Sequence, residues 1–218
     1  MSLAINQDNP QSRQGSVVDK AERRLVELLF LNSEISLYAM MVIGGGFWWI
    51  LTRSVPYFWP SVWVVAVCGL QLIRVFHIRS FLKLSDEQRG DCVSHVKQFW
   101  LLGSFSALTW SSALLFFYNP VNESFFIVYA FVTAGIACVA ISSLAYVPKT
   151  YPIFITIILL PLSWFFYSKG GMENIFLGTT VMAFIGFGTA LSHRLRANVT
   201  QSISLELTNF ELAETLQK

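Results

Sequence analysis

Six long apolar runs, separated by short polar segments, dominate the sequence. Each run is long enough, or nearly so, to cross about 30 Å of hydrocarbon as a helix that rises about 1.5 Å per residue. The runs occupy residues 35–51, 59–76, 99–118, 125–147, 153–167 and 175–191. The pattern therefore predicts an all-α protein, an integral membrane bundle of six transmembrane helices.

Polar and amphipathic segments flank this bundle. Residues 1–16 are polar and are expected to form a disordered tail, and residues 17–33 interleave apolar and charged side chains as in an amphipathic helix at the membrane interface. The six-helix domain then covers residues 34–193. Residues 194–218 predict a cytoplasmic signalling helix, the start of a coiled coil, with Val199, Ile203 and Phe210 as positions of a signal relay.

Composition and charge distribution indicate that membrane lipid is the partner of the predicted bundle. Apolar residues make up 54% and charged residues 13% of the 218 residues, against roughly 25% charged residues in soluble domains. Eleven lysines and arginines, Arg74 among them, flank one side of the predicted bundle, and only Arg53 and Lys169 flank the other. We therefore expect both termini in the cytoplasm. The net charge of +2 does not indicate a nucleic-acid partner.

Polar and large aromatic side chains within the spans are the candidates for ligand binding. No carboxylate lies in the middle of a predicted span, and ion and proton pathways usually require one, so we do not expect an ion transporter. Gln71, Arg74, Trp110, Thr133 and Trp164 could instead bind a lipophilic small molecule and orient its polar head. The alternative is that they hydrogen-bond and pack between helices.

The three histidines, His77, His95 and His193, all lie near the predicted inner boundary. Two of them could ligate a metal ion or a b-type haem, since imidazole serves both. The alternative is that they are interfacial residues beside lysines and arginines, in which case the chain binds no cofactor.

Proline and small residues suggest where the spans bend or approach closely. Pro161 removes a backbone hydrogen bond inside the fifth run and should kink it. Gly186 and Gly188 lie in the sixth run, and we expect all three positions to act as flexing points in a signal relay. Small residues recur at every fourth position from 130 to 142 and favour close helix packing, with a hinge or a dimer contact as the alternative.

The stretch 74–218 resembles a known class of membrane region. It contains R-V-F-H-I-R-S-F after the second run, W-L-L-G-S-F-S-A-L-T-W in the third, A-G-I-A-C-V-A-I-S-S-L-A-Y-V-P in the fourth and S-H-R-L-R-A-N-V-T-Q-S-I-S-L-E-L-T-N-F-E-L at the end. These segments are similar to the N-terminal membrane sensor region of bacterial sensor histidine kinases, and similar regions precede GGDEF diguanylate cyclases. The resemblance implies a location in the bacterial inner membrane.

The resemblance implies an input module that forms a homodimer through its last helix and passes a conformational change along that helix. The chain carries no H-box, ATP-binding motif or G-G-D-E-F run, so we expect no enzyme activity from it and a kinase or cyclase domain after residue 218. Two alternatives stay open: a small transporter or channel for a neutral solute, and a haem-binding redox or gas sensor.

Overall fold

The computed structural model describes residues 10–84, 92–118 and 123–216, which form helices and turns without any strand. The helices are α1 (Pro10–Leu51), α2 (Phe58–Leu82), α3 (Cys92–Phe117), α4 (Glu123–Leu144), α5 (Thr150–Lys169) and α6 (Met172–Leu216). Each contains a stretch that is long and apolar enough to cross a membrane. The prediction of an all-α membrane bundle with six spanning helices is confirmed.

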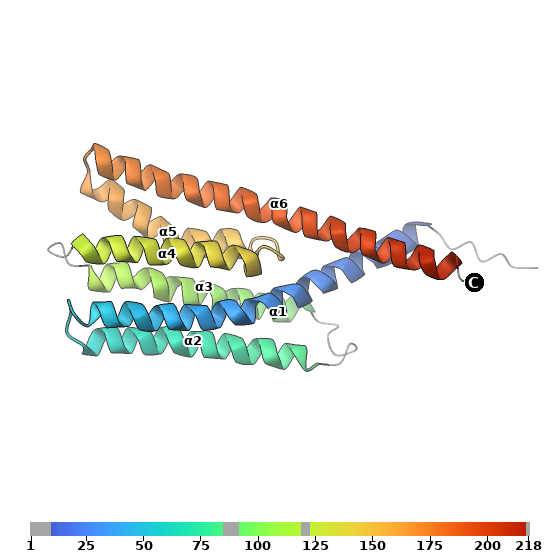
Figure 1. Cartoon of the computed structure of the whole chain (residues 1–218), viewed down its shortest axis with the longest axis horizontal. Helices are drawn as coiled ribbons and strands as arrows, with labels where there is room; N and C mark the ends of the chain where they lie inside the picture. The colour runs from blue at the N-terminus through green and yellow to red at the C-terminus, as the bar shows by residue number, and fades with distance from the viewer. Residues whose placement is uncertain (1–9, 85–91, 119–122, 217–218) are drawn as a thin grey trace, which may run out of the picture.

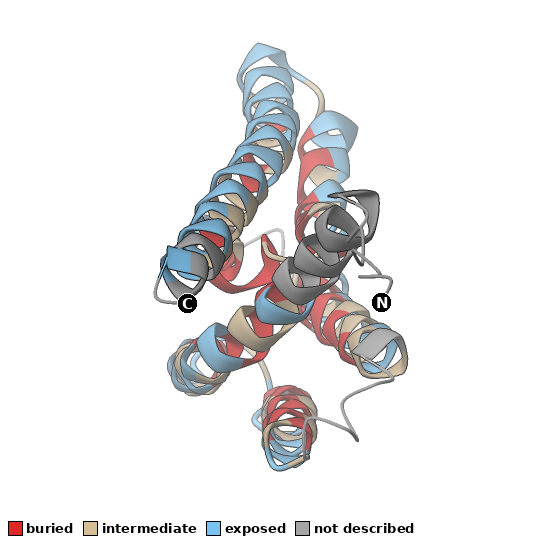
Figure 2. Cartoon of the chain, turned by 90° about the vertical axis from the view of Figure 1, so that its right-hand side faces the viewer, coloured by how far each residue is buried: buried red, intermediate tan, exposed pale blue. Residues whose placement is uncertain are grey.

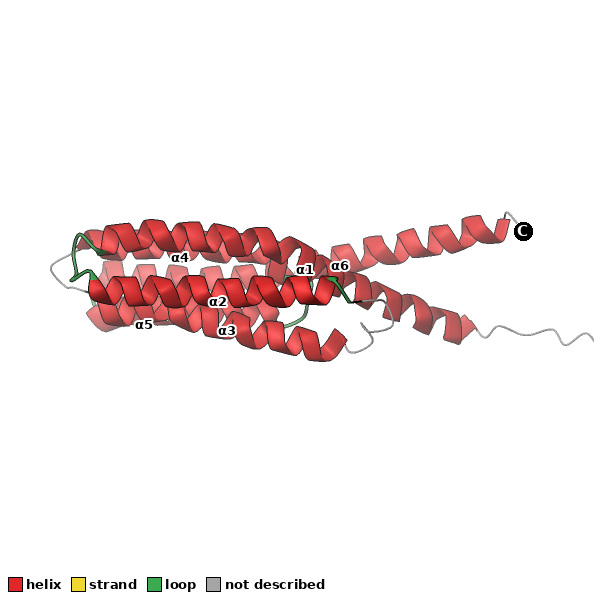
Figure 3. Ribbon diagram, turned by 90° about the horizontal axis from the view of Figure 1, so that it is seen from below, coloured by secondary structure: helices red, strands yellow, loops and turns green. Residues whose placement is uncertain are grey.

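The helices run side by side along the long axis of the molecule (Figure 1). α1 packs on α2 and α4, whereas α3 packs on α2 and α5, and α6 packs mainly on α5. The beginning of α1 and the end of α6 project from the same end of the bundle, here called the terminal end (Figures 1 and 3). The opposite end, called the turn end, holds the connections α1–α2, α3–α4 and α5–α6.

A cluster of aromatic side chains fills the centre of the bundle. The Trp63 and Trp110 rings meet edge to face with centroids 5.1 Å apart, and Phe47 lies 5.6 Å from Trp63. Tyr129 completes the cluster from α4, 6.1 Å from Phe47. These four residues are buried, and the buried residues of the chain lie mainly on the helix faces that are turned toward other helices (Figure 2). Edge-to-face geometry adds to the apolar burial of such rings.

α1 is one unbroken helix that takes in part of the expected tail and the whole of the expected interfacial helix. Its first residue is Pro10, so residues 10–16 of the expected disordered tail are helical, whereas residues 1–9 of that tail lie outside the described part. The expected interfacial helix 17–33 continues into the first span without a break. Proline is well tolerated at the first position of a helix, and none follows it before Leu51. Phe30 is buried and stacks on Phe81 of α2 at 4.3 Å, so this part of α1 packs against the bundle.

The α5–α6 turn depends on two glycines. Gly170 and Gly171 have φ values of +65° and +82°, a region that side chains with a Cβ rarely adopt. The resulting turn is so tight that α6 begins at Met172, three residues after α5 ends at Lys169. α5 changes direction along its length (Figure 1), as expected from Pro161 in its interior.

Candidate ligand-binding site

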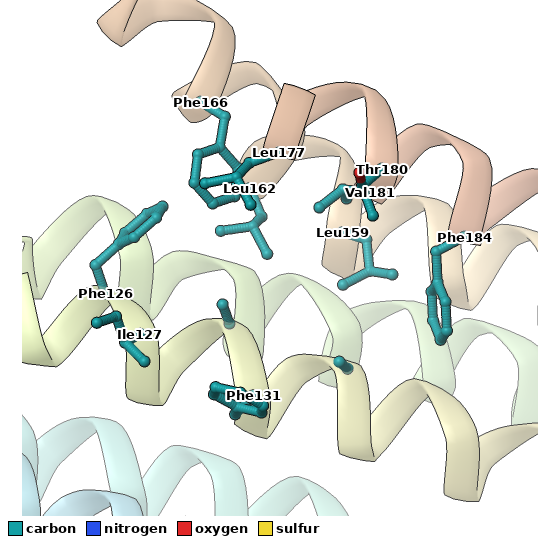
Figure 4. Close-up of a pocket in the computed structure, with 12 residues that line it drawn as sticks. Phe126, Ile127, Phe131, Leu159, Leu162, Phe166, Leu177, Thr180, Val181 and Phe184 are labelled. Carbon is teal, nitrogen blue, oxygen red and sulfur yellow. The ribbon is translucent and has the colours of Figure 1, made fainter. Parts of the chain in front are cut away.

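An apolar groove of about 390 Å³ lies between α4 and α6, with α5 behind it (Figure 4). Its volume falls in the range of roughly 300–1,000 Å³ that is usual for small-molecule sites. The lining side chains are apolar except for Thr180. Each of the three helices contributes large side chains to this lining, among them Phe126, Phe131, Leu162, Phe166, Val181 and Phe184. The groove suits an apolar molecule or the tail of an amphiphile.

Small side chains on α4 explain why this groove exists. Ala130 and Ala134 line it, and neither is large enough to fill the space between α4 and α6. Further along the same stripe, Cys138 is exposed, so this part of the stripe does not pack against another helix of the chain. The alanines of α4 that are buried are Ala137 and Ala140, on a neighbouring face.

A chain of polar side chains is buried between α2 and α3. Gln71 donates from Nε2 to Ser106 Oγ at 2.6 Å, and Arg74 donates from Nη1 to Gln71 Oε1 at 3.3 Å. All three residues are buried. The guanidinium carbon of Arg74 lies 4.8 Å from the centre of the Phe99 ring, within the range of a cation–π interaction. Arg74 therefore lies inside the bundle, as expected of a side chain that hydrogen-bonds between helices, and the prediction that it is one of the charges flanking the bundle is wrong.

The other predicted ligand residues lie apart from this chain. Trp110 is fully buried in the central aromatic cluster. Thr133 is buried too, and its hydroxyl donates to the carbonyl groups of its own helix at Tyr129 and Ala130, 2.8 and 3.1 Å away. Trp164 is 74% exposed on α5 and lines a separate groove of about 780 Å³ between α3 and α5. Gln71 and Arg74 are the two predicted residues that the fold brings together.

Two of the three histidines are neighbours. The rings of His77 and His95 lie 5.5 Å apart, and His77 Nε2 is 3.2 Å from the main-chain oxygen of His95. Phe30 and Phe81 pack on the edges of this pair. His193 is exposed on α6. A haem or metal ion bound through His77 Nε2 would have to displace the contact with the His95 carbonyl, and haem ligation stays a prediction.

Two glycines of α6 are contact points with α5. A Cβ on Gly188 would lie 2.8 Å from Tyr151 Oη, and one on Gly178 would lie 3.2 Å from the Tyr167 ring. Ser163 Oγ also donates to the Gly178 carbonyl at 3.0 Å. Gly186, in contrast, has no neighbour within 4 Å of an added Cβ. α6 is helical through all three glycines. Because α5 side chains contact α6 at Gly178 and Gly188, the two helices form a closely packed pair.

Beyond the bundle, α6 crosses the first part of α1 (Figure 1). Leu25 of α1 and Ile203 of α6 are buried against each other, with Val199 and Leu207 packed around them. The predicted relay residues Val199 and Ile203 therefore contact α1 of the same chain. Phe210 is 71% exposed and lies on a part of α6 that this contact leaves uncovered.

Ser106 and the groove residues were not among the predicted site residues. A serine within an apolar run gives no sign that a glutamine of another span faces it. The alanines at 130 and 134 were noticed, but their small size was interpreted as a sign of packing, whereas in the fold it creates space. No protein-family model, no curated protein and no solved structure was found to match this chain.

Proposed function

We propose that this chain is the membrane input module of a bacterial signal-transduction protein, a histidine kinase or hybrid kinase, with a diguanylate cyclase as the alternative output. It would lie in the inner membrane with the terminal end in the cytoplasm, where most lysines and arginines gather. A lipophilic molecule or a property of the membrane would be the signal. The catalytic domain would be supplied from outside this chain.

The observation that carries the proposal is that α6 forms one wall of the apolar groove and also runs out of the bundle. α6 has 45 residues, about 68 Å at 1.5 Å per residue, whereas about 30 Å suffices to cross the hydrocarbon. A molecule in the groove would therefore touch the same rigid helix that extends past the terminal end. This supports a relay without a separate sensing domain.

The packing suggests how the relay would work. α6 is tied to α5 at Gly178 and Gly188 but has few contacts with α4. An occupant of the groove would therefore separate α4 from the α5–α6 pair instead of pulling α6 off α5. The displacement would travel along α6 to its crossing with α1 at Leu25 and Ile203.

Dimerisation would use the part of α6 that this crossing leaves free. Val199, Ile203 and Leu207 pack near α1, whereas Leu205, Phe210 and Leu216 are 56%, 71% and 87% exposed. Apolar side chains so exposed on a polar helix are typical of an interface with another helix. A second copy of the chain would cover them.

Disulfide crosslinking in membranes tests the proposal. Single cysteines would be placed along positions 199–216 in a chain whose Cys68, Cys92 and Cys138 are serine. We expect dimer crosslinks at 205, 210 and 216 to exceed those at 203, because position 203 faces α1. Absence of dimer crosslinks at every position would refute the dimeric relay.

A groove-filling variant tests the coupling between groove and α6. Ala134→Phe fills the groove, whereas Cys138→Phe adds the same ring one turn along α4 at an exposed position that does not line it. We expect Ala134→Phe to change the crosslinking pattern of α6 and Cys138→Phe to leave it unchanged. Equal patterns for both variants would show that the groove does not act on α6.

A further inference from the structure

Arg74 is a cation enclosed within the bundle, and no carboxylate of the described residues lies beside it. It is 1% exposed and contacts the Gln71 amide oxygen and the face of the Phe99 ring. Its Nε atom has no hydrogen-bond partner, although a guanidinium carries five N–H donors. A buried charge of this kind is costly unless an opposite charge or several acceptors compensate it.

A small cavity lies beside this guanidinium. Arg74 lines it together with Gly103 and Ser104 of α3, Leu144 at the end of α4, and Thr150 and Phe154 of α5. Its volume is about 10 Å³, which is close to the space that one water molecule needs. Gly103 has no side chain to fill it, and an added Cβ would lie 3.6 Å from Arg74 Nη2.

The cavity also lies at the N-terminus of α5, because Thr150 is the first residue of that helix. The N–H groups of Thr150 and Ile153 already donate to the carbonyl groups of Val147 and Lys149, at 3.4 and 3.1 Å, and Pro152 has no N–H, so this end contributes chiefly the partial positive charge of the helix dipole. A cation and a helix N-terminus repel each other, but both attract an anion. Two independent features thus favour negative charge at one small space.

We propose that Arg74 and the N-terminus of α5 bind a small anionic group. The cavity holds about one water molecule, so the group is limited to a halide ion, and neither a carboxylate with its carbon chain nor a phosphate headgroup fits. Arg74 lies eight residues before the end of α2 at Leu82, about 12 Å along the helix. Gln71, held by Ser106, positions the guanidinium. The proposal does not rest on the signalling function.

Thermal unfolding of the full chain in an uncharged detergent tests the proposal. In one arm chloride replaces gluconate at constant ionic strength, and in the other decanoate is compared with decanol. Binding to the folded state alone raises the midpoint by roughly 5–10 °C at a hundred times the dissociation constant. A shift with chloride identifies a halide as the ligand, whereas decanoate, whose carboxylate the cavity is too small to hold, should shift the midpoint no more than decanol does. A decanoate shift beyond that of decanol would overturn the assignment of a halide.

Two variants assign the shift to this site. Arg74→Gln should abolish it, whereas Arg79→Gln should keep it, because Arg79 is exposed on the same helix and paired with Glu34 at 2.6 Å. An equal shift in Arg74→Gln would overturn the proposal. If that variant does not fold, Thr150→Val, which removes the hydroxyl at the α5 N-terminus, should raise at least threefold the chloride concentration that gives half of the shift. An unchanged chloride concentration in this variant would overturn the proposal, and so would a wild-type protein that does not respond to chloride.

Discussion

Replacing Gly188 by alanine should loosen the packing of α6 on α5, and replacing Gly186 by alanine should not. The two glycines are two residues apart on the same helix. At Gly188 the new Cβ would lie 2.8 Å from Tyr151 Oη and 3.0 Å from Ile155 Cδ1, and at Gly186 it would meet nothing within 4 Å. Tyr151 and Ile155 are buried, so neither can swing away freely.

The magnitude follows from two opposed effects. Overpacking a filled interface costs about 1–3 kcal/mol, whereas alanine in place of glycine within a helix contributes up to about 1 kcal/mol. Gly188→Ala should therefore lose about 1–2 kcal/mol, and Gly186→Ala should be neutral or slightly more stable than wild type. A difference of about 2 kcal/mol is roughly a thirtyfold change in the unfolding equilibrium constant.

Reversible unfolding in mixed micelles, followed by tryptophan fluorescence as the denaturing detergent is increased, measures this difference. Tyr151→Phe removes the closest atom, so combining it with Gly188→Ala should recover part of the loss in a double-mutant cycle. A Gly188→Ala protein as stable as Gly186→Ala would refute the close contact. Full loss in the double variant would assign the strain to Ile155 instead.

Two further pairs of substitutions test the core and the α1–α6 crossing by the same unfolding assay. Trp63→Phe should destabilise the folded protein more than Trp110→Phe does. Trp63 Nε1 donates to the Thr109 carbonyl at 2.8 Å, whereas Trp110 Nε1 is buried without a partner among the described residues, so its loss removes no hydrogen bond. Equal losses of stability would contradict this reasoning. Leu25→Ala and Ile203→Ala should each lower the free energy of unfolding by roughly 2 kcal/mol. The double variant should lose less than the sum of the two, because the two side chains touch. Losses that add fully would argue against the contact between α1 and α6.

The number and type of the helices could be predicted because hydropathy decides them. A run of apolar residues in lipid must satisfy its backbone internally, and a helix is the simplest way to do so. The ends were predicted less well. The second run was expected to end at residue 76, but α2 continues to Leu82, since its last turns expose Arg79, which pairs with Glu34, and bury Phe81.

The rotation of each helix could not be predicted from the sequence. α4 is apolar on every side, so no polar face indicates which residues turn inward. The regular stripe of small residues suggested one face, yet Ala137 and Ala140 are buried while Cys138 is exposed. For the same reason the sequence left Arg74 open between a charge that flanks the bundle and a side chain that hydrogen-bonds between helices, because a position near the end of an apolar run is compatible with both.

α5 connects the cavity beside Arg74 with the apolar groove. Its first residue, Thr150, borders the cavity beside Arg74, and further along Leu162 and Phe166 line the apolar groove. The same helix holds α6 through Gly178 and Gly188. A shift of α5 along its axis would therefore change the Arg74 cavity, the groove and the position of α6 together, because interlocked side chains do not deform independently. Binding free energies at two such sites are linked reciprocally, so an anion at Arg74 and an apolar molecule in the groove would each change the affinity for the other by the same factor.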